Sequence, residues 1–217
     1  MPMNKVVHAA QRAAFSAAID VAINAVRGKG TEKLSENAVK LVNLAEPLLK
    51  DRYPASAFDA ARKFVSDPNG KWMQYAYRAI NEIDPHVLKM NALNLVYEGM
   101  FSGYNYVCEL REKYDCNMPW ILLFDPTSAC NLHCTGCWAA EYGNKLNMSF
   151  ETMDNIIRQG KELGTYMYIF SGGEPMVRKD DIIRLCETHP DCMFLAFTNG
   201  TLIDGKFAEE MLRVKNF

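Results

Sequence analysis

The chain has 217 residues, of which 49% are apolar and 23% are charged. These values are ordinary for a globular protein, and they exclude a disordered chain, a collagen and a coiled-coil array. The formal charge is −2, from 24 basic and 26 acidic residues, so the composition gives no electrostatic reason to expect nucleic-acid binding.

The start of the chain predicts neither a signal peptide nor a membrane span. Residues 1–24 lack the order of a charged start, an apolar run and a cleavage site. The apolar stretch from Ala13 to Val26 is interrupted by Ser16, Asp20 and Asn24 and is too short to cross a bilayer. We therefore expect a cytoplasmic protein, in which seven cysteines indicate metal binding or redox chemistry rather than disulfides.

Residues 1–118 predict an all-helical N-terminal domain, because their apolar residues recur at helical spacing. Asp84 and Pro85 are typical of a helix start. Gly99 and Gly103 make possible a kink in the last helix or a close contact of that helix. The five predicted helices are Lys5–Arg27, Thr31–Lys50, a short helix opened by Pro54, Lys71–Ile83, and one from Pro85 to about Lys113.

Residues 119–217 predict alternating strands and helices. Three apolar runs, Trp120–Phe124, Tyr166–Phe170 and Met193–Phe197, indicate parallel strands that are buried on both faces. Helices are expected between Ser149 and Gly164, over about Lys179–Thr188, and after Asp204. This order predicts an α/β fold with a parallel sheet and right-handed crossovers, in which functional residues gather at the carboxyl ends of the strands.

Three cysteines follow the first strand at the spacing C-x3-C-x2-C: Cys130, Cys134 and Cys137. Three thiolates are one ligand short of the four that complete an ordinary iron–sulfur cluster or a structural zinc site. An open metal position for a substrate or cofactor is therefore the favoured interpretation. Two alternatives remain, a zinc site completed by His133 or a distant residue, and a set of buried structural thiols.

Distinctive segments also follow the other two strands. In Ser171-Gly-Gly-Glu-Pro175, the glycines let the backbone approach a ligand closely, and Glu174 suits a ligand ammonium; a plain turn is the alternative. Thr198-Asn-Gly-Thr201 fits a ligand contact or a turn. After the first strand, Asp125 either points into the mouth of the fold or caps the strand end.

Taken together, these segments resemble the radical S-adenosylmethionine (SAM) superfamily over about residues 119–217. Cys130, Cys134 and Cys137 look like its cluster motif, and Ser171–Pro175 resembles its methionine-binding motif. Phe197-Thr-Asn-Gly200 is similar to a segment of the branch that contains molybdopterin-precursor, peptide-modifying and heme-pathway enzymes. The resemblance implies a partial (βα)6-type barrel of three βα units.

The resemblance also implies a mechanism. The three cysteines hold a [4Fe-4S] cluster, and the amino and carboxylate groups of SAM chelate its fourth iron. Glu174 and the backbone of Gly172 and Gly173 hold the methionine amino group, and Pro175, Thr198 and Asn199 belong to the same cofactor-binding segments. Electron transfer from the cluster yields a 5′-deoxyadenosyl radical that acts on an unknown substrate. A reductant such as ferredoxin or flavodoxin is implied; no catalytic residue is named.

The sequence departs from the family pattern in two ways. Gly136 stands where an aromatic residue near the adenine is usual, so Trp138 or the backbone at Gly136 takes that place. The chain also supplies three βα units where a family barrel has six. We therefore expect an N-terminal fragment of a longer protein, with domains at 1–118 and 119–217, that behaves poorly alone because the edge of its third strand is exposed.

Other interpretations of the chain stay open. One is an iron–sulfur or zinc module without SAM cleavage, and another is a helical interaction protein with a degenerate barrel. The opening helix suits a solvent-facing bundle, with contact to a membrane surface as the alternative. Four further cysteines are expected to be ordinary packing thiols, with a second metal site as the alternative: Cys108, Cys116, Cys186 and Cys192.

Overall fold

The structure is a computed structural model that describes residues 5–51 and 53–217, apart from the side chains of Lys5, Leu48, Ala140 and Glu141. The chain divides into two compact units. One unit is Ser16–Leu88, and the other joins the start of the chain, up to Phe15, to Lys89–Phe217. No helix in the described ranges is both long and apolar enough to cross a membrane.

The smaller unit is helical. It holds most of α1 (Lys5–Val26), together with α2 (Thr31–Leu49), α3 (Ala55–Val65) and α4 (Lys71–Glu82). Side chains tie the helices together, since the Ser35 hydroxyl donates to the Val65 carbonyl at 2.6 Å. The apolar residues Val26, Phe58 and Met73 are buried. These helices begin and end within a few residues of the predicted bounds.

The last predicted helix of this region is continuous but changes its winding. It comprises α5 (Pro85–Ala92), a π-helix η1 (Leu93–Gly103) and α6 (Tyr104–Tyr114). Asp84 caps its start, because one carboxylate oxygen accepts hydrogen bonds from the backbone N–H groups of the second and third residues that follow. A side chain at Gly103 would collide with the carbonyl of Gly164. The close contact predicted at Gly103 is therefore present.

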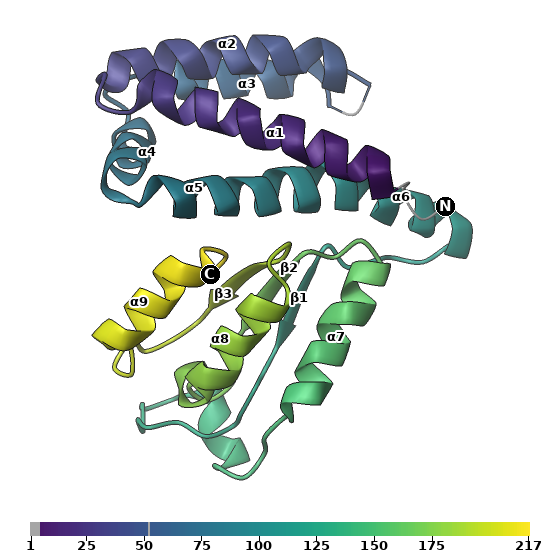
Figure 1. Cartoon of the computed structure of the whole chain (residues 1–217), viewed down its shortest axis with the longest axis vertical. Coiled ribbons are helices and arrows are strands. Elements are labelled where there is room, and N and C mark those ends of the chain that lie inside the picture. Colours follow the sequence, from purple (N-terminus) through teal and green to yellow (C-terminus); the bar gives the residue numbers. More distant parts are fainter. Residues whose placement is uncertain (1–4, 52) are drawn as a thin grey trace. The chain divides into compact units, whose positions relative to one another are not determined.

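The second region forms a parallel three-stranded sheet in the order β1-β2-β3, with β1 at Ile121–Phe124, β2 at Met167–Phe170 and β3 at Met193–Ala196. The register places Phe124 beside Phe170 and Phe170 beside Ala196. Three helices, α7 (Phe150–Glu162), α8 (Lys179–Thr188) and α9 (Gly205–Val214), follow the strands in turn (Figure 1). The α/β prediction is confirmed.

One face of the sheet packs against these helices. Tyr168, Phe170 and Phe194 are fully buried on this face, and the rings of Phe170 and Phe194 stack with centroids 5.6 Å apart. The alternate residues face away, and Leu123 and Leu195 are exposed. The prediction that the strands are buried on both faces is therefore wrong at these positions, because the three helices lie on one side.

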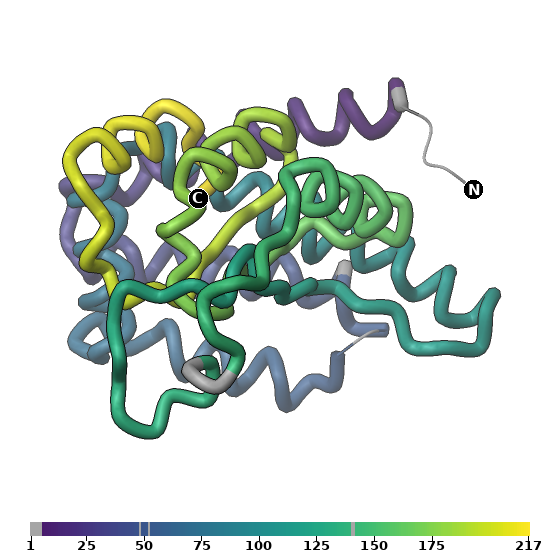
Figure 2. The backbone as a smooth tube through the Cα atoms, turned by 90° about the horizontal axis from the view of Figure 1, so that it is seen from below, coloured from purple at the N-terminus to yellow at the C-terminus, as the bar shows by residue number. Residues whose placement is uncertain are grey.

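The two ends of the strands differ in structure. We call the side where the strands end the carboxyl edge and the side where they begin the amino edge. At the carboxyl edge, seen nearest to the viewer in Figure 2, a long segment joins β1 to α7 and contains the short 3-10 helix η2 (Trp138–Tyr142). A second 3-10 helix, η3 (Pro175–Arg178), follows β2. Residues that follow all three strands therefore meet on this side.

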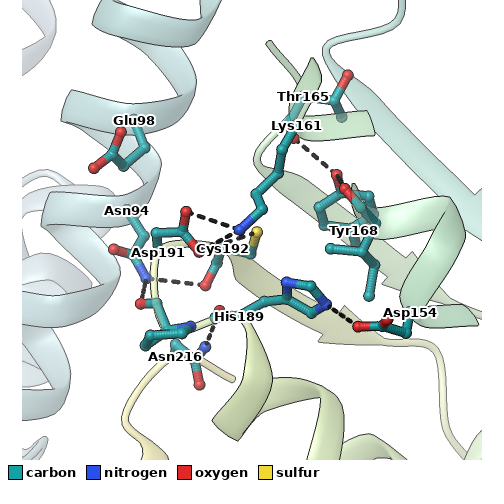
Figure 3. Close-up of polar contacts among 12 residues, drawn as sticks. Asn94, Glu98, Asp154, Lys161, Thr165, Tyr168, His189, Asp191, Cys192 and Asn216 are labelled. Atoms are coloured by element: carbon teal, nitrogen blue, oxygen red, sulfur yellow. Dashed lines mark hydrogen bonds and ion pairs between the residues drawn. The ribbon is translucent and has the colours of Figure 1, made fainter. Parts of the chain in front are cut away.

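At the amino edge, polar side chains fix the turn between α8 and β3 (Figure 3). The Asn94 amide donates to the carbonyls of Pro190 and Cys192, each at 2.9 Å. The Asn216 amide donates to the carbonyls of Cys186 and His189. The Asn94 bonds attach η1 to the segment before β3, and residues 89–118 group with the sheet in one compact unit. The predicted domain boundary at residue 118 stays a prediction about independent folding.

Cys186 and Cys192 lie in this region as buried thiols. Burial raises the pKa of both thiols well above the ordinary range. A protonated, buried thiol is a poor metal ligand, because the thiolate is the form that binds metal. This geometry favours the packing role over a second metal site.

The amino edge predicts a dependence of stability on pH through His189. The ring is buried and donates from Nε2 to the Asp154 carboxylate at 2.9 Å, and burial lowers the pKa of His189. The unfolded chain therefore takes up a proton near pH 6.5, before the folded chain does. The free energy of unfolding should fall between about pH 7.5 and about pH 5.5.

Urea unfolding at several pH values measures this effect. His189→Gln should lose less stability across the range, because glutamine does not titrate there. His133→Gln, at an exposed position, is the matched control and should keep the wild-type dependence. Equal pH dependence in wild type and His189→Gln would contradict the assignment.

Candidate functional site

The candidate site lies at the carboxyl edge of the sheet, where three segments follow β1, β2 and β3. The ladder continues beyond the strands, since Ser171 donates its N–H to the Phe124 carbonyl at 3.1 Å and Phe197 donates to the Phe170 carbonyl at 2.9 Å. These bonds hold the beginnings of the segments side by side, as parallel strand ends require.

The cysteine loop presents its thiols to the surface. Cys130 is half-buried, Cys134 and Cys137 are exposed, and all three are free of disulfides. The loop turns at Gly136, whose φ of 73° lies in the left-handed region that favours glycine. Within the described ranges, no group of three or more histidine, cysteine, aspartate or glutamate residues is arranged to hold a metal ion.

By donor chemistry, the loop nonetheless fits a soft metal centre. Three accessible thiols stand within residues 130–137, and the backbone N–H of Leu132 donates to the Cys130 sulfur at 3.4 Å. Hydrogen bonds to sulfur stabilise the thiolate and are a feature of cluster ligands. His133 is exposed within the same loop. These three cysteines could hold a cluster.

Gly172 and Gly173 press against the backbone that leads into the cysteine loop. The Gly173 N–H donates to the Thr127 carbonyl at 3.0 Å, and the Glu174 N–H donates to the Ala129 carbonyl at 2.8 Å. A side chain on Gly172 would lie 2.5 Å from the Thr127 carbonyl oxygen, and one on Gly173 would collide with the carbonyl of Ala129. The close approach expected of these glycines is made to the chain itself, and it positions the cysteine loop.

Glu174 is buried and its carboxylate is occupied by the protein. One oxygen accepts hydrogen bonds from the Met176 N–H at 2.9 Å and from the Thr198 hydroxyl at 2.6 Å. The other oxygen accepts from the Asn199 N–H at 2.8 Å. Only 1% of the residue is exposed, so this geometry joins the segment after β2 to the segment after β3. Pro175, also buried, begins η3.

Asn199 continues this connection toward the first cysteine. Its side-chain amide donates to the side-chain oxygen Oδ1 of Asn131 at 3.0 Å and lies 4.0 Å from the Cys130 sulfur. Asn131 in turn donates to the Thr201 hydroxyl at 2.7 Å. The structure therefore brings Glu174, Thr198 and Asn199 together with Cys130. Sequence reasoning missed Asn131, although its position directly after a cysteine was a usable signal.

A cavity of about 390 Å³ opens beside the glycines. Trp138 and Tyr142 from η2 line it, with ring centroids 6.0 Å apart and nearly perpendicular planes. Asp125 also lines it, and one buried carboxylate oxygen of Asp125 has no hydrogen-bond partner in the described part of the chain. Burial raises the pKa of Asp125. Asp125 therefore points into a cavity, whereas Gly136 and Pro175 are not among the residues that line it.

The remaining cysteines lie outside this site. Cys108 is half-buried on α6, and Cys116 is exposed after that helix ends.

Comparison with known proteins gives the family. Residues 124–216 match the sequence model of the Radical SAM superfamily. An uncharacterized protein of Archaeoglobus fulgidus is 31% identical over 114 residues, which are 51% of this chain and 25% of that protein. The Fe-coproporphyrin III synthase of Methanosarcina barkeri is 32% identical over 99 residues, which are 43% of this chain and 24% of that protein.

A GTP 3',8-cyclase of Shewanella denitrificans is 35% identical over 79 residues, which are 34% of this chain and 23% of that protein. The chain thus spans about a quarter of the length of these curated relatives. No solved structure matches at comparable significance. The match covers β2, β3, the cysteine loop and the segments that follow β2 and β3, and this part of the chain matches the Radical SAM superfamily.

Proposed function

We propose that this chain is part of an enzyme that binds a [4Fe-4S] cluster through Cys130, Cys134 and Cys137 and reductively cleaves SAM to a 5′-deoxyadenosyl radical, which acts on a substrate. The observation that carries the proposal is the placement of three accessible, free thiols on the loop after β1, at the edge where the other motif segments meet. That edge lies within the residues that match the family.

The bound cluster would supply a low-potential electron to the sulfonium of SAM. The chain's own residues would hold and orient it. The N–H of Leu132 and the amide of Asn199 approach the Cys130 sulfur, so they would stabilise negative charge on that ligand. Gly172 and Gly173 fix the start of the loop through their contacts with residues 127–129.

The adjoining residues would receive SAM. Trp138 is exposed beside the third cysteine and lines the cavity, so we assign it, with the backbone at Gly136, to the side of the adenine. Thr198 and Asn199 would border the bound molecule, since both lie beside the cysteine loop through Glu174. A ferredoxin or flavodoxin would deliver the electron, because the proposed reaction needs an external low-potential donor.

Anaerobic reconstitution tests the cluster assignment. Wild-type chain treated with iron and sulfide should become brown and hold about four iron atoms per chain. Cys130→Ser should lose most of this iron, because a hydroxyl is a poor ligand for the cluster. Cys116→Ser, at an exposed thiol outside the loop, is the matched control and should keep the wild-type iron content.

Equal iron in Cys130→Ser and wild type would contradict the assignment, as would a colourless chain that binds zinc alone. Formation of 5′-deoxyadenosine from SAM under dithionite, measured by chromatography, then separates a SAM-cleaving enzyme from a cluster-binding module.

The hydrogen bonds of Glu174 predict a structural cost on substitution. Glu174→Gln replaces one of the two accepting oxygens with an amide group that donates, so this group faces either the donors of Met176 and Thr198 or the N–H of Asn199. The free energy of unfolding should fall by about 2 to 3 kcal/mol, since hydrogen bonds to buried charged groups are lost. Urea unfolding measures this loss.

Glu209→Gln, at an exposed position on α9, should change the stability by less than about 0.5 kcal/mol. A Glu174→Gln chain as stable as this control would show that the Glu174 carboxylate does not hold the two segments together.

A further inference from the structure

Three side chains at the carboxyl edge form a closed ring of hydrogen bonds. The Asn199 amide donates to Oδ1 of Asn131 at 3.0 Å, and the Asn131 amide donates to the Thr201 hydroxyl at 2.7 Å. The Thr201 hydroxyl in turn donates to Oδ1 of Asn199 at 2.7 Å. Each side chain therefore donates to the next one, and hydrogen bonds connected in this way strengthen one another. We call these three residues the hydrogen-bond ring.

The hydrogen-bond ring determines which way the Asn199 amide faces. Its oxygen accepts from two donors of Thr201, the hydroxyl and the backbone N–H at 3.0 Å. Its nitrogen faces Asn131 and the Cys130 sulfur, which lies 4.0 Å away. If the amide were turned over, its oxygen would face the sulfur and the bonds to both ring partners would be lost. The ring therefore directs an N–H donor toward the first cysteine of the loop.

The backbone beneath this amide is also fixed. The Asn199 N–H donates to the carboxylate of Glu174, which is buried, at 2.8 Å. The Thr198 hydroxyl donates to the same carboxylate and accepts from the Gly200 N–H at 3.0 Å. Gly200 has a φ of 75°, which favours glycine, and this turn returns Thr201 to the oxygen of Asn199. The amide is thus held at its backbone and at both of its polar atoms.

A local turn does not by itself account for the ring. A turn of this kind needs only the oxygen of Asn199 and the backbone N–H of Thr201. Asn131 belongs to the cysteine loop, and 68 residues separate it from Asn199 in the sequence. The three residues are exposed, so water can replace the ring bonds at little cost to the stability of the fold. The effect of the ring is therefore on the surroundings of Cys130.

A hydrogen bond to a ligand sulfur changes the reduction potential of an iron–sulfur cluster. The reduced cluster carries one more negative charge than the oxidised cluster, so an N–H that faces the sulfur favours reduction. We propose that Asn131 and Thr201 are positioning residues, which hold the Asn199 amide toward the Cys130 sulfur and make a bound cluster easier to reduce. The inference rests on the proposed function, because it needs a cluster on Cys130.

The test measures the midpoint reduction potential of the reconstituted, anaerobic chain without SAM. Dithionite is added stepwise, each cluster takes up one electron, and the paramagnetic resonance signal of the reduced cluster is recorded. Thr201→Val removes the hydroxyl, and Asn131→Ala removes the ring member of the cysteine loop. Both variants should have a more negative midpoint than wild type. The double variant should shift no further than the larger single shift, because each change opens the same ring.

Two variants serve as controls. Thr201→Ser keeps a hydroxyl at the same position and should keep the wild-type midpoint potential. Thr188→Val removes an exposed hydroxyl at the end of α8 that donates to the Arg184 carbonyl of the same helix, so it should also keep that potential. Iron content and thermal unfolding of the cluster-free chain are measured for every variant. Thr201→Val and Asn131→Ala should match wild type in both, because the ring is exposed.

Four results would overturn the inference. One is a wild-type midpoint potential in Thr201→Val and Asn131→Ala, and another is an equal shift in Thr188→Val or Thr201→Ser. The third is loss of iron or a lower unfolding midpoint in both ring variants, which would mark a structural role. The fourth is a wild-type chain that holds no iron, and then the proposed function fails too. The first three results leave wild type with its cluster, so the inference alone fails.

Discussion

The close contact between two stretches of backbone organises the carboxyl edge of this sheet. Gly172 and Gly173 lie against Thr127–Ala129, and two N–H groups of the second segment donate to carbonyls of the first. Any side chain at these glycines would force the stretches apart. Because Cys130 comes directly after Ala129, the position of the cysteine loop relative to β2 depends on this contact.

Two carboxylates at this edge have opposite environments. Glu174 is enclosed and saturated by three donors from two segments, so it acts within the fold. Asp125 has one enclosed oxygen without a hydrogen-bond partner among the described residues, and it lines the cavity beside Trp138. A buried charge stabilises a fold only when it is paired and hydrogen-bonded. The two carboxylates therefore differ in their hydrogen bonds to the chain, and this difference separates their assignments more than their sequence context does.

The elements of the second region could be predicted closely, because short apolar runs and helix caps are local signals. The strands begin and end within one residue of the runs, and the Ser149 hydroxyl caps α7 as expected by accepting from the Thr152 N–H. The apolar runs could not show that Leu123 and Leu195 are exposed, because the type of a residue does not reveal whether another helix or strand packs against it. The widened winding of η1 has no local sequence signal of this kind.

The site was predictable as a set of motifs, but not as a set of roles. The spacing of the cysteines and the order of the three segments identify the family, which the match to residues 124–216 supports. Whether Glu174 or Asp125 meets a ligand depends on hydrogen bonds between segments that lie far apart in the chain. A sequence pattern gives the types of the ligand-binding residues and their spacing. The hydrogen-bond partner of a particular carboxylate oxygen depends on the fold.

The amino edge is held by side-chain hydrogen bonds from two asparagines. There, Asn94 and Asn216 give the turn before β3 four side-chain hydrogen bonds, and Lys161 pairs with Asp191 at 3.1 Å. These bonds stabilise the amino edge, although the side-chain oxygen of Asn216 and Nδ1 of His189 have no hydrogen-bond partner among the described residues. The carboxyl edge holds exposed thiols and one carboxylate oxygen without such a partner, and functional sites often hold groups that oppose folding.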